Sequence, residues 1–119
     1  MTAPRHITIA DVKVGNDLPL VMIAGPCVME SRDHAMKMAE SLAELANSLD
    51  IGIVYKSSFD KANRSSVHSF RGPGLEKGLQ ILADIKSKFG VPIISDVHEP
   101  EQAAPAAEVC DIIQLPAFL

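Results

Sequence analysis

The chain alternates between short apolar runs and longer segments with helical spacing. After an alternating opener at residues 6–15, apolar runs occupy residues 18–27, 51–56, 91–99 and 111–119. The first of these runs continues without a polar face until Gly25-Pro26, which is typical of a buried strand. The pattern therefore predicts an N-terminal β-hairpin followed by four strands, of which the fourth extends to the last residue.

Helical segments separate the predicted strands. In the first, Ser31 is the expected N-cap and Asp33 lies in the first turn. Its apolar residues follow the spacing of one helical face: Ala35, Met38, Ala39, Leu42, Leu45, Ala46 and Leu49. A second helix is expected over residues 74–90, with Gly90 as its stop signal.

A shorter third helix is expected over residues 101–109, interrupted or bent at Pro105. The repeated strand–helix order predicts an α/β fold with a parallel sheet and right-handed crossovers. An open four-stranded sheet fits this chain length, whereas a (β/α)8 barrel needs about 250 residues. Because a parallel strand is normally buried on both faces, a chain that ends on an uncovered apolar strand indicates half of a larger domain.

Polar residues gather where the predicted strands end, and parallel α/β folds place functional residues at these positions. Lys56 ends the second strand, Asp96 and His98 end the third, and Gln114 belongs to the fourth. Residues two apart point to the same face of a strand, so Asp96 and His98 should lie together in one shared pocket. This pair can transfer protons or bind hydroxyl groups, or it can serve only as a loop cap and a half-buried histidine.

Charge is distributed unevenly along the chain. The net charge is -4 and the pI is near 5.5, yet Lys56, Lys61 and Arg64 lie within eleven residues beside four serines and one asparagine, with Arg71 as a further candidate. Without a broad positive field, neither nucleic-acid binding nor anionic-membrane binding is expected. A signal peptide or membrane span is not expected either, which predicts a cytoplasmic protein. The basic loop suits a ligand with phosphate or carboxylate groups, although a solvated surface loop is the alternative.

The two cysteines, Cys27 and Cys110, do not predict a disulfide framework. Cys27 directly follows Gly25-Pro26 and has three readings: a soft metal ligand, a nucleophile or a small buried hydrophobe. No second cysteine or histidine lies at zinc-site spacing from it, so other ligands would come from far along the chain. Cys110 is expected to be structural.

Four segments together carry a family resemblance. They are "AGPCVMES", "YKSSFDKANRSSVHSFRGPGLE", "SDVHEP" and "DIIQLPAFL". With them the chain resembles the 3-deoxy-D-manno-octulosonate 8-phosphate synthases, also called 2-dehydro-3-deoxyphosphooctonate aldolases, over nearly everything from Leu18 to Leu119. The run "FDKANRSS" is highly specific to these enzymes, whereas "GPC" is shared with the 3-deoxy-heptulosonate 7-phosphate synthases.

The resemblance implies a (β/α)8 TIM barrel, usually a homotetramer, of which residues 1–119 would be the N-terminal half. It implies a transferase of lipopolysaccharide biosynthesis that condenses phosphoenolpyruvate with D-arabinose 5-phosphate. It also implies roles for individual side chains. Lys56 and Lys61 would face phosphoenolpyruvate, with Lys61 also near the aldehyde. The pentose and its phosphate would be held by Asn63, Arg64 and Ser65, and the barrel mouth would be lined by Asp96, His98 and Gln114.

Cys27 gives the resemblance a further implication. Family members with cysteine after Gly-Pro resemble the metal-dependent class, so Cys27 would bind a divalent ion such as Zn²⁺, Fe²⁺, Mn²⁺ or Co²⁺. Two alternatives to this function remain. One is the sister enzyme that uses erythrose 4-phosphate, which the run "KANRSS" disfavours. The other is a non-catalytic half-barrel that pairs through its sheet edges.

Overall fold

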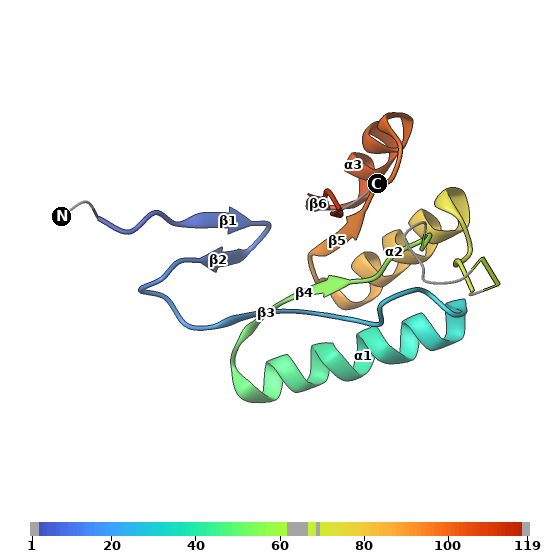
Figure 1. The fold of residues 1–119 in the computed structure, drawn as a ribbon. Helices are drawn as coiled ribbons and strands as arrows, with labels where there is room; N and C mark the ends of the chain where they lie inside the picture. The colour runs from blue at the N-terminus through green and yellow to red at the C-terminus, as the bar shows by residue number, and fades with distance from the viewer. Residues whose placement is uncertain (1–2, 62–66, 69, 118–119) are drawn as a thin grey trace.

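The computed structural model describes residues 3–61, 67–68 and 70–117. Its elements follow the predicted order (Figure 1). They are β1 (Ile7–Ile9), β2 (Val12–Val14), β3 (Val21–Ala24), α1 (Arg32–Leu49), β4 (Gly52–Lys56), α2 (Leu75–Phe89), β5 (Ile93–Asp96), the 3-10 helix η1 (Pro100–Gln102), α3 (Ala103–Val109) and β6 (Ile112–Gln114).

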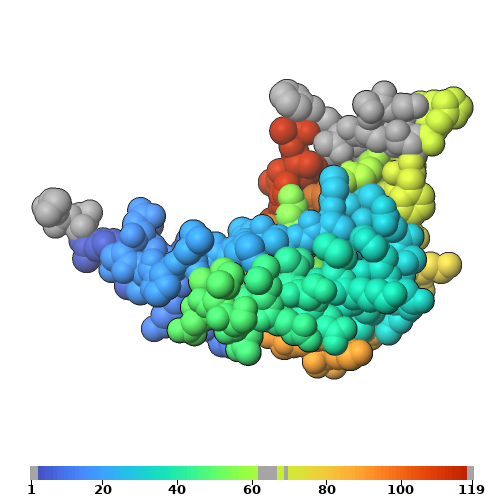
Figure 2. Space-filling model, turned by 90° about the horizontal axis from the view of Figure 1, so that it is seen from below, coloured from blue at the N-terminus to red at the C-terminus, as the bar shows by residue number. Residues whose placement is uncertain are grey.

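The strands form two sheets. β1 and β2 make the predicted antiparallel hairpin, and β3 to β6 form a four-stranded parallel sheet in chain order. A helix connects each pair of neighbouring parallel strands, so the predicted strand–helix–strand connections are confirmed. The hairpin lies to one side of the parallel sheet in Figure 1, and Figure 2 shows it at one end of the molecule, beyond α1.

The apolar core lies between the parallel sheet and its helices. Ile53, Tyr55 and Ile93 supply the strand side of this core, where they meet alanines of α1 and apolar residues of α2. Alanines at positions 35, 39 and 46 let α1 approach the sheet closely, and the Tyr55 hydroxyl donates to the Ala35 carbonyl oxygen at 3.4 Å. Burial raises the pKa of Tyr55 to about 12. Each large apolar side chain buried here stabilises the fold by roughly 1.5–3 kcal/mol.

The helix ends agree with the local sequence chemistry. Ser31 is the N-cap of α1, and its hydroxyl accepts a hydrogen bond from the His34 backbone N–H at 3.1 Å. Gly90 ends α2 with a φ of 67°, a left-handed conformation that glycine adopts at low cost. The predicted apolar face of α1 is only partly buried, because Leu45 lies about 100° round the helix from Ala46 and is 48% exposed.

Three local predictions are wrong. β3 is not buried on both faces, because it is an edge strand among the described residues and its Ile23 is 52% exposed. The fourth parallel strand does not continue to the end of the chain, since β6 stops at Gln114. Pro105 does not bend the third helix, because it lies in the first turn of α3, where a missing N–H removes no helical hydrogen bond.

Among the described residues, the helices pack against one face of the parallel sheet and leave the other face uncovered. Strand register and side-chain alternation place Ile23, Val54, Ile94 and Ile112 on this open face, opposite the core residues Ile53, Tyr55 and Ile93. Val54 and Ile94 are nevertheless buried, so Ile23 is the large side chain that this face exposes most. Both edge strands, β3 and β6, have a single strand neighbour among the described residues. Within the same residues, no helix has the length and apolar character needed to cross a bilayer.

The edges of the parallel sheet predict that the purified chain self-associates. Unpaired edges of parallel strands pair readily with other strands, and the exposed Ile23 adds apolar surface beside one of them. Native mass spectrometry should therefore detect oligomers. Ile23→Lys should reduce them by placing a charge on the edge strand, whereas Leu45→Lys on the outside of α1 should not. A chain that stays monomeric at its highest soluble concentration would contradict this prediction.

Candidate active site

Side chains from three neighbouring strands meet where β4, β5 and β6 end. Register and alternation place them on the open face, beyond its apolar residues. We call this group the strand-end cluster. Its members are Lys56, Ser58, Asp96, His98 and Gln114. The sequence had placed four of these five residues in one shared pocket, and the fifth, Ser58, follows Lys56 by two positions on the same face.

Asp96 is the centre of the strand-end cluster. One carboxylate oxygen accepts a hydrogen bond from the Ser58 hydroxyl at 2.5 Å, and the other lies 2.9 Å from His98 Nε2. The side chains of His98 and Asp96 are only 4% and 6% exposed. Asp96 and His98 therefore lie together as strand alternation predicts, in a largely desolvated pair whose hydrogen bond is electrostatically stronger than it would be in water.

Lys56 and Gln114 complete the strand-end cluster. Lys56 is half-buried, and within the described ranges no hydrogen bond or ion pair engages its ammonium group. Gln114 is paired in register with Asp96, and its carbonyl oxygen accepts from the Val97 N–H at 3.1 Å. Its side-chain oxygen is buried and has no hydrogen-bond partner among the described residues. Both groups can therefore bind a polar ligand at the end of the sheet.

Sequence reasoning missed three residues that support the pair. Ser58 could have been found by continuing the alternation of β4 past Lys56. Gln102 could have been found from the Glu99-x-x-Gln102 spacing of a capping box, and its side-chain oxygen accepts from the His98 N–H at 2.8 Å. Phe59 contacts the His98 ring edge-on, with ring centroids 5.7 Å apart. No local signal indicates this last contact, which joins residues from the segments that follow two different strands.

A bulge follows β3 and exposes Cys27. Ala24 pairs with Tyr55, and Val28 pairs with Ser58. Between these two pairings the first segment advances four residues and the second advances three, so the first segment contains one extra residue. At Gly25 the backbones approach so closely that a Cβ would lie 1.7 Å from the Lys56 carbonyl oxygen. The carbonyl oxygen of Cys27 accepts from the Ser58 N–H at 3.2 Å. Because Cys27 is exposed, the reading of this residue as a small buried hydrophobe is wrong.

The donors in the described part of the chain do not form a complete metal centre. No group of three or more histidine, cysteine, aspartate or glutamate side chains converges within residues 3–61, 67–68 and 70–117. Cys27 is thus a single accessible thiol, and a closed site needs four ligands. Any metal bound by Cys27 would need ligands from outside these residues.

The basic loop is fastened at its base. Lys61 is half-buried, and its N–H donates to the Arg71 carbonyl oxygen at 2.7 Å. The Arg71 guanidinium makes two hydrogen bonds to Asp60, at 2.8 and 2.7 Å, and this carboxylate raises the pKa of Arg71. Arg71 is therefore engaged within the loop. The predicted substrate-binding residues Asn63, Arg64 and Ser65 lie outside the described residues.

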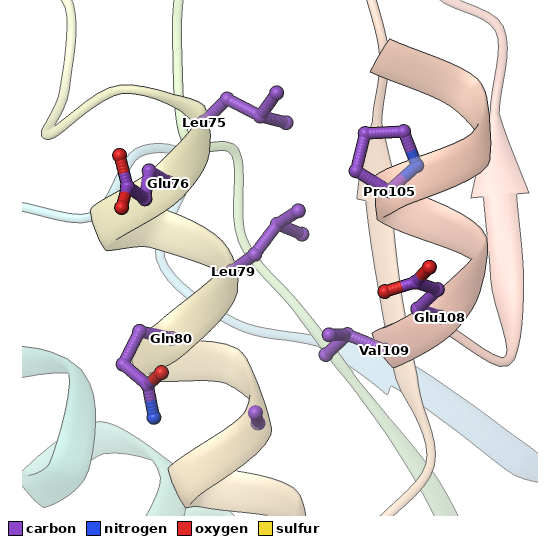
Figure 3. A pocket seen from close by; sticks show the side chains of 8 residues that line it. Leu75, Glu76, Leu79, Gln80, Pro105, Glu108 and Val109 are labelled. Carbon is purple, nitrogen blue, oxygen red and sulfur yellow. The ribbon is translucent and has the colours of Figure 1, made fainter.

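A hollow of about 350 Å³ lies away from the strand-end cluster, between α2 and α3 (Figure 3). Leu75, Leu79, Pro105 and Val109 give it an apolar lining, with Glu76 and Glu108 beside them. These side chains belong to the helix layer and include no basic group, so this hollow does not suit a phosphorylated ligand. The strand-end cluster remains the candidate site.

The two cysteines should react at very different rates with a thiol reagent. Cys27 is exposed, whereas Cys110 is buried and desolvation raises its pKa from 9.0 to about 11. Since the thiolate is the reactive form, the native chain at pH 8 should be modified at Cys27 alone, and at both positions in denaturant. Burial of the neutral Cys110 thiol should also make the free energy of unfolding depend on pH. Its stabilising contribution is complete below pH 9.0 and is lost as the pH rises towards about 11. Equal rates in the native chain would contradict the burial of Cys110.

Comparison with known proteins finds relatives that share one name. A 2-dehydro-3-deoxyphosphooctonate aldolase of Marinobacter nauticus is 66% identical over 117 residues, which are 98% of this chain and 42% of the relative. Proteins of the same name from Pseudomonas fluorescens and Rickettsia rickettsii are 60% and 56% identical, over 98% and 97% of this chain and again 42% of each relative. The chain therefore spans less than half the length of these curated relatives.

The family comparison covers nearly all of the chain. The model of the DAHP synthetase I family matches residues 4–119, a range that includes the hairpin, the parallel sheet and every residue of the strand-end cluster. An α/β chain with a parallel sheet fits this TIM-barrel family. The chain belongs to the DAHP synthetase I family.

Proposed function

We propose that this chain carries part of the active site of a synthase that condenses phosphoenolpyruvate with D-arabinose 5-phosphate. The products are 3-deoxy-D-manno-octulosonate 8-phosphate and phosphate. The observation that carries the proposal is the 56–66% identity, over 97–98% of the chain, to relatives named 2-dehydro-3-deoxyphosphooctonate aldolase. The basic loop beside the strand-end cluster supports it, because both substrates are phosphorylated anions.

The residues of this chain would bind and orient the two anions. Lys56 and Lys61 would neutralise phosphoenolpyruvate, which carries a carboxylate and a phosphate, and Asn63, Arg64 and Ser65 would hold the pentose phosphate. Neutralising both anions reduces their mutual repulsion and holds the reacting carbons close together.

The reaction joins C3 of phosphoenolpyruvate to the aldehyde carbon of the pentose, whose oxygen takes up a proton. Water adds at C2, and the phosphate leaves by cleavage of its C–O bond, so that C2 becomes a ketone. Positive charge develops at C2, and the carboxylates and dipoles of the site must stabilise it. Lys61, Asp96 and His98 are the proposed catalytic residues, and the Asp96–His98 pair would accept or supply the protons. Gln114 would bind a substrate hydroxyl group.

We propose that four parallel strands of this chain belong to a (β/α)8 barrel of a cytoplasmic homotetramer that serves lipopolysaccharide biosynthesis. Cys27 would be the ligand from this chain to a divalent ion, Zn²⁺, Fe²⁺, Mn²⁺ or Co²⁺, with the other ligands supplied from outside the described residues. When bound, such an ion would supply Lewis acidity, which polarises a carbonyl group or lowers the pKa of water. The exposure of Cys27, whose backbone carbonyl oxygen is bound by Ser58 of the strand-end cluster, supports this assignment.

A chimeric enzyme tests the proposed function. In this chimera, the present chain replaces the matching 117-residue segment of the Marinobacter nauticus relative. We expect the chimera to release phosphate from phosphoenolpyruvate only when arabinose 5-phosphate is present, and we expect the isolated chain to be inactive. Faster reaction with erythrose 4-phosphate would favour the sister enzyme, and no reaction with either aldose would favour the non-catalytic half-barrel.

Arg64→Ala in the chimera should weaken binding of the pentose phosphate selectively. The substitution removes a charge-assisted hydrogen bond worth about 1.5–3 kcal/mol, so the KM for arabinose 5-phosphate should rise roughly 10- to 100-fold. The KM for phosphoenolpyruvate should change little, and Arg5→Ala, which removes an exposed arginine near the N-terminus, should change neither. Equal effects of Arg64→Ala on both substrates would refute the assignment.

A further inference from the structure

Ser58 occupies the junction between the Cys27 segment and the Asp96–His98 pair. Its N–H donates to the Cys27 carbonyl oxygen at 3.2 Å, and its own carbonyl oxygen accepts from the Met29 N–H at 3.1 Å. Its hydroxyl donates to Asp96 Oδ1 at 2.5 Å. Ser58 is 1% exposed, so all three of these hydrogen bonds are shielded from water.

The hydroxyl of Ser58 determines how Asp96 is used. Ser58 binds Oδ1 and His98 faces Oδ2, and the two contacts together fix the plane of the carboxylate. A neutral histidine that donates from Nε2 has its lone pair on Nδ1. That Nδ1 is buried and has no hydrogen-bond partner among the described residues.

We propose that Ser58 is a positioning residue: it acts through Asp96 to hold His98 in the Nε2–H tautomer, which keeps Nδ1 available as an acceptor for an O–H donor. The donor is a substrate hydroxyl or the reacting water, so the inference rests on the proposed function. It also divides the roles within the pair. His98 is the residue that meets the O–H group, and Asp96 orients the imidazole through its contact with Nε2.

Loss of the Ser58 hydroxyl has a defined consequence. Asp96 Oδ1 then lacks its donor in a buried site, and the carboxylate can rotate to seek another partner. His98 Nε2 loses a fixed acceptor, so the imidazole populates both tautomers and both ring orientations. A threonine at position 58 keeps the hydroxyl and should preserve the arrangement.

The test compares Ser58→Ala, Ser58→Thr and Ser95→Ala in the chimera. Ser95 is the matched control, because it is a buried serine on the helix-facing side of β5 whose hydroxyl contacts the Asp96 backbone and not its carboxylate. Ser58→Ala should lower kcat roughly 10- to 100-fold and leave the KM for phosphoenolpyruvate nearly unchanged. Ser58→Thr should restore most of this loss, and Ser95→Ala should have little effect.

Nitrogen-15 NMR of labelled histidine supplies a readout that does not depend on activity. His98, assigned by the loss of its signals in His98→Gln, should be the Nε2–H tautomer in the unsubstituted chimera and a mixture of tautomers in Ser58→Ala. If Ser58→Ala does not fold, Ser58→Cys gives the same comparison, because it keeps the size of the side chain and weakens the donor. An unchanged kcat together with an unchanged tautomer in the variant would overturn the proposal.

Failure of the proposed function is distinguishable from failure of this inference. A folded chimera that does not react with phosphoenolpyruvate and arabinose 5-phosphate refutes the proposed function. In that case, the comparison of tautomers between the unsubstituted chimera and Ser58→Ala still decides whether Ser58 positions His98. A mixture of tautomers in the unsubstituted chimera would overturn the inference whatever the activity.

Discussion

Asp96→Ala in the chimera should reduce kcat/KM at least 100-fold and destabilise the fold at the same time. The substitution leaves the Ser58 hydroxyl without its acceptor and His98 without its partner, in a site where the His98 side chain is 4% exposed. General acid–base groups contribute roughly 10²- to 10⁴-fold to a rate. Removing one partner of a buried, hydrogen-bonded pair lowers the free energy of unfolding by about 3 kcal/mol. Steady-state kinetics and urea denaturation measure the two effects.

Two further variants separate the catalytic part of this effect from the structural part. Asp96→Asn keeps the shape and most of the packing, so it should retain most of the stability while losing most of the activity. Asp84→Ala is the control for an ion pair that is not buried, because Asp84 pairs with Arg32 at the surface of the helix layer. It should leave the activity unchanged. An Asp96→Ala enzyme with full activity would show that the strand-end cluster is not the active site.

Cys27→Ser should abolish tight metal binding by the chimera. A thiolate is a strong ligand for borderline divalent ions, and its replacement by a hydroxyl should weaken metal affinity on the order of 100-fold. Chelation should inactivate the chimera, and added Mn²⁺ or Co²⁺ should restore activity. Elemental analysis and the Co²⁺–thiolate absorption band measure binding independently of activity. The isolated chain should bind metal weakly, since Cys27 is the only thiol exposed in its described residues.

Cys110→Ala is the matched control for this experiment. Cys110 is buried in the core, with its pKa raised to about 11, so its removal should leave metal affinity intact even if it lowers stability. Full activity of the chimera after exhaustive chelation, with no metal left by elemental analysis, would contradict the metal assignment. Cys27 would then be only an exposed thiol in the bulge.

Local chemistry determines the parts of the fold that the sequence predicts well. Ser31 caps α1 and Gly90 ends α2 because each residue satisfies backbone groups within a few positions of itself. The exposure of Ile23 could not be read in this way, because it depends on whether a neighbouring strand covers an apolar residue. The position of Pro105 relative to the start of α3 depends similarly on η1, which precedes it.

The candidate site likewise contains one contact that the sequence predicts and others that it does not. Alternation along β5 places Asp96 and His98 on one face, so their contact follows from the sequence. The hydrogen bond from Ser58 to Asp96 joins residues 38 positions apart and depends on the relative register of two strands. The bulge that exposes Cys27 is likewise a mismatch between β3 and β4, and the pattern of one strand does not contain it.

The basic loop can be exchanged as a unit, because hydrogen bonds join the two ends of the segment. The Gly74 N–H donates to the Phe59 carbonyl oxygen at 3.0 Å, and the Asp60–Arg71 pair holds the two arms together inside that contact. With its ends held by the scaffold, a new insert changes the closure entropy little, by about 0.6 kcal/mol for each doubling of length. Selection can therefore rewrite the residues between Lys61 and Arg71 without rebuilding the strand-end cluster. On the proposed function, a single barrel can in this way acquire a preference for a longer or shorter aldose phosphate by exchange of one short segment.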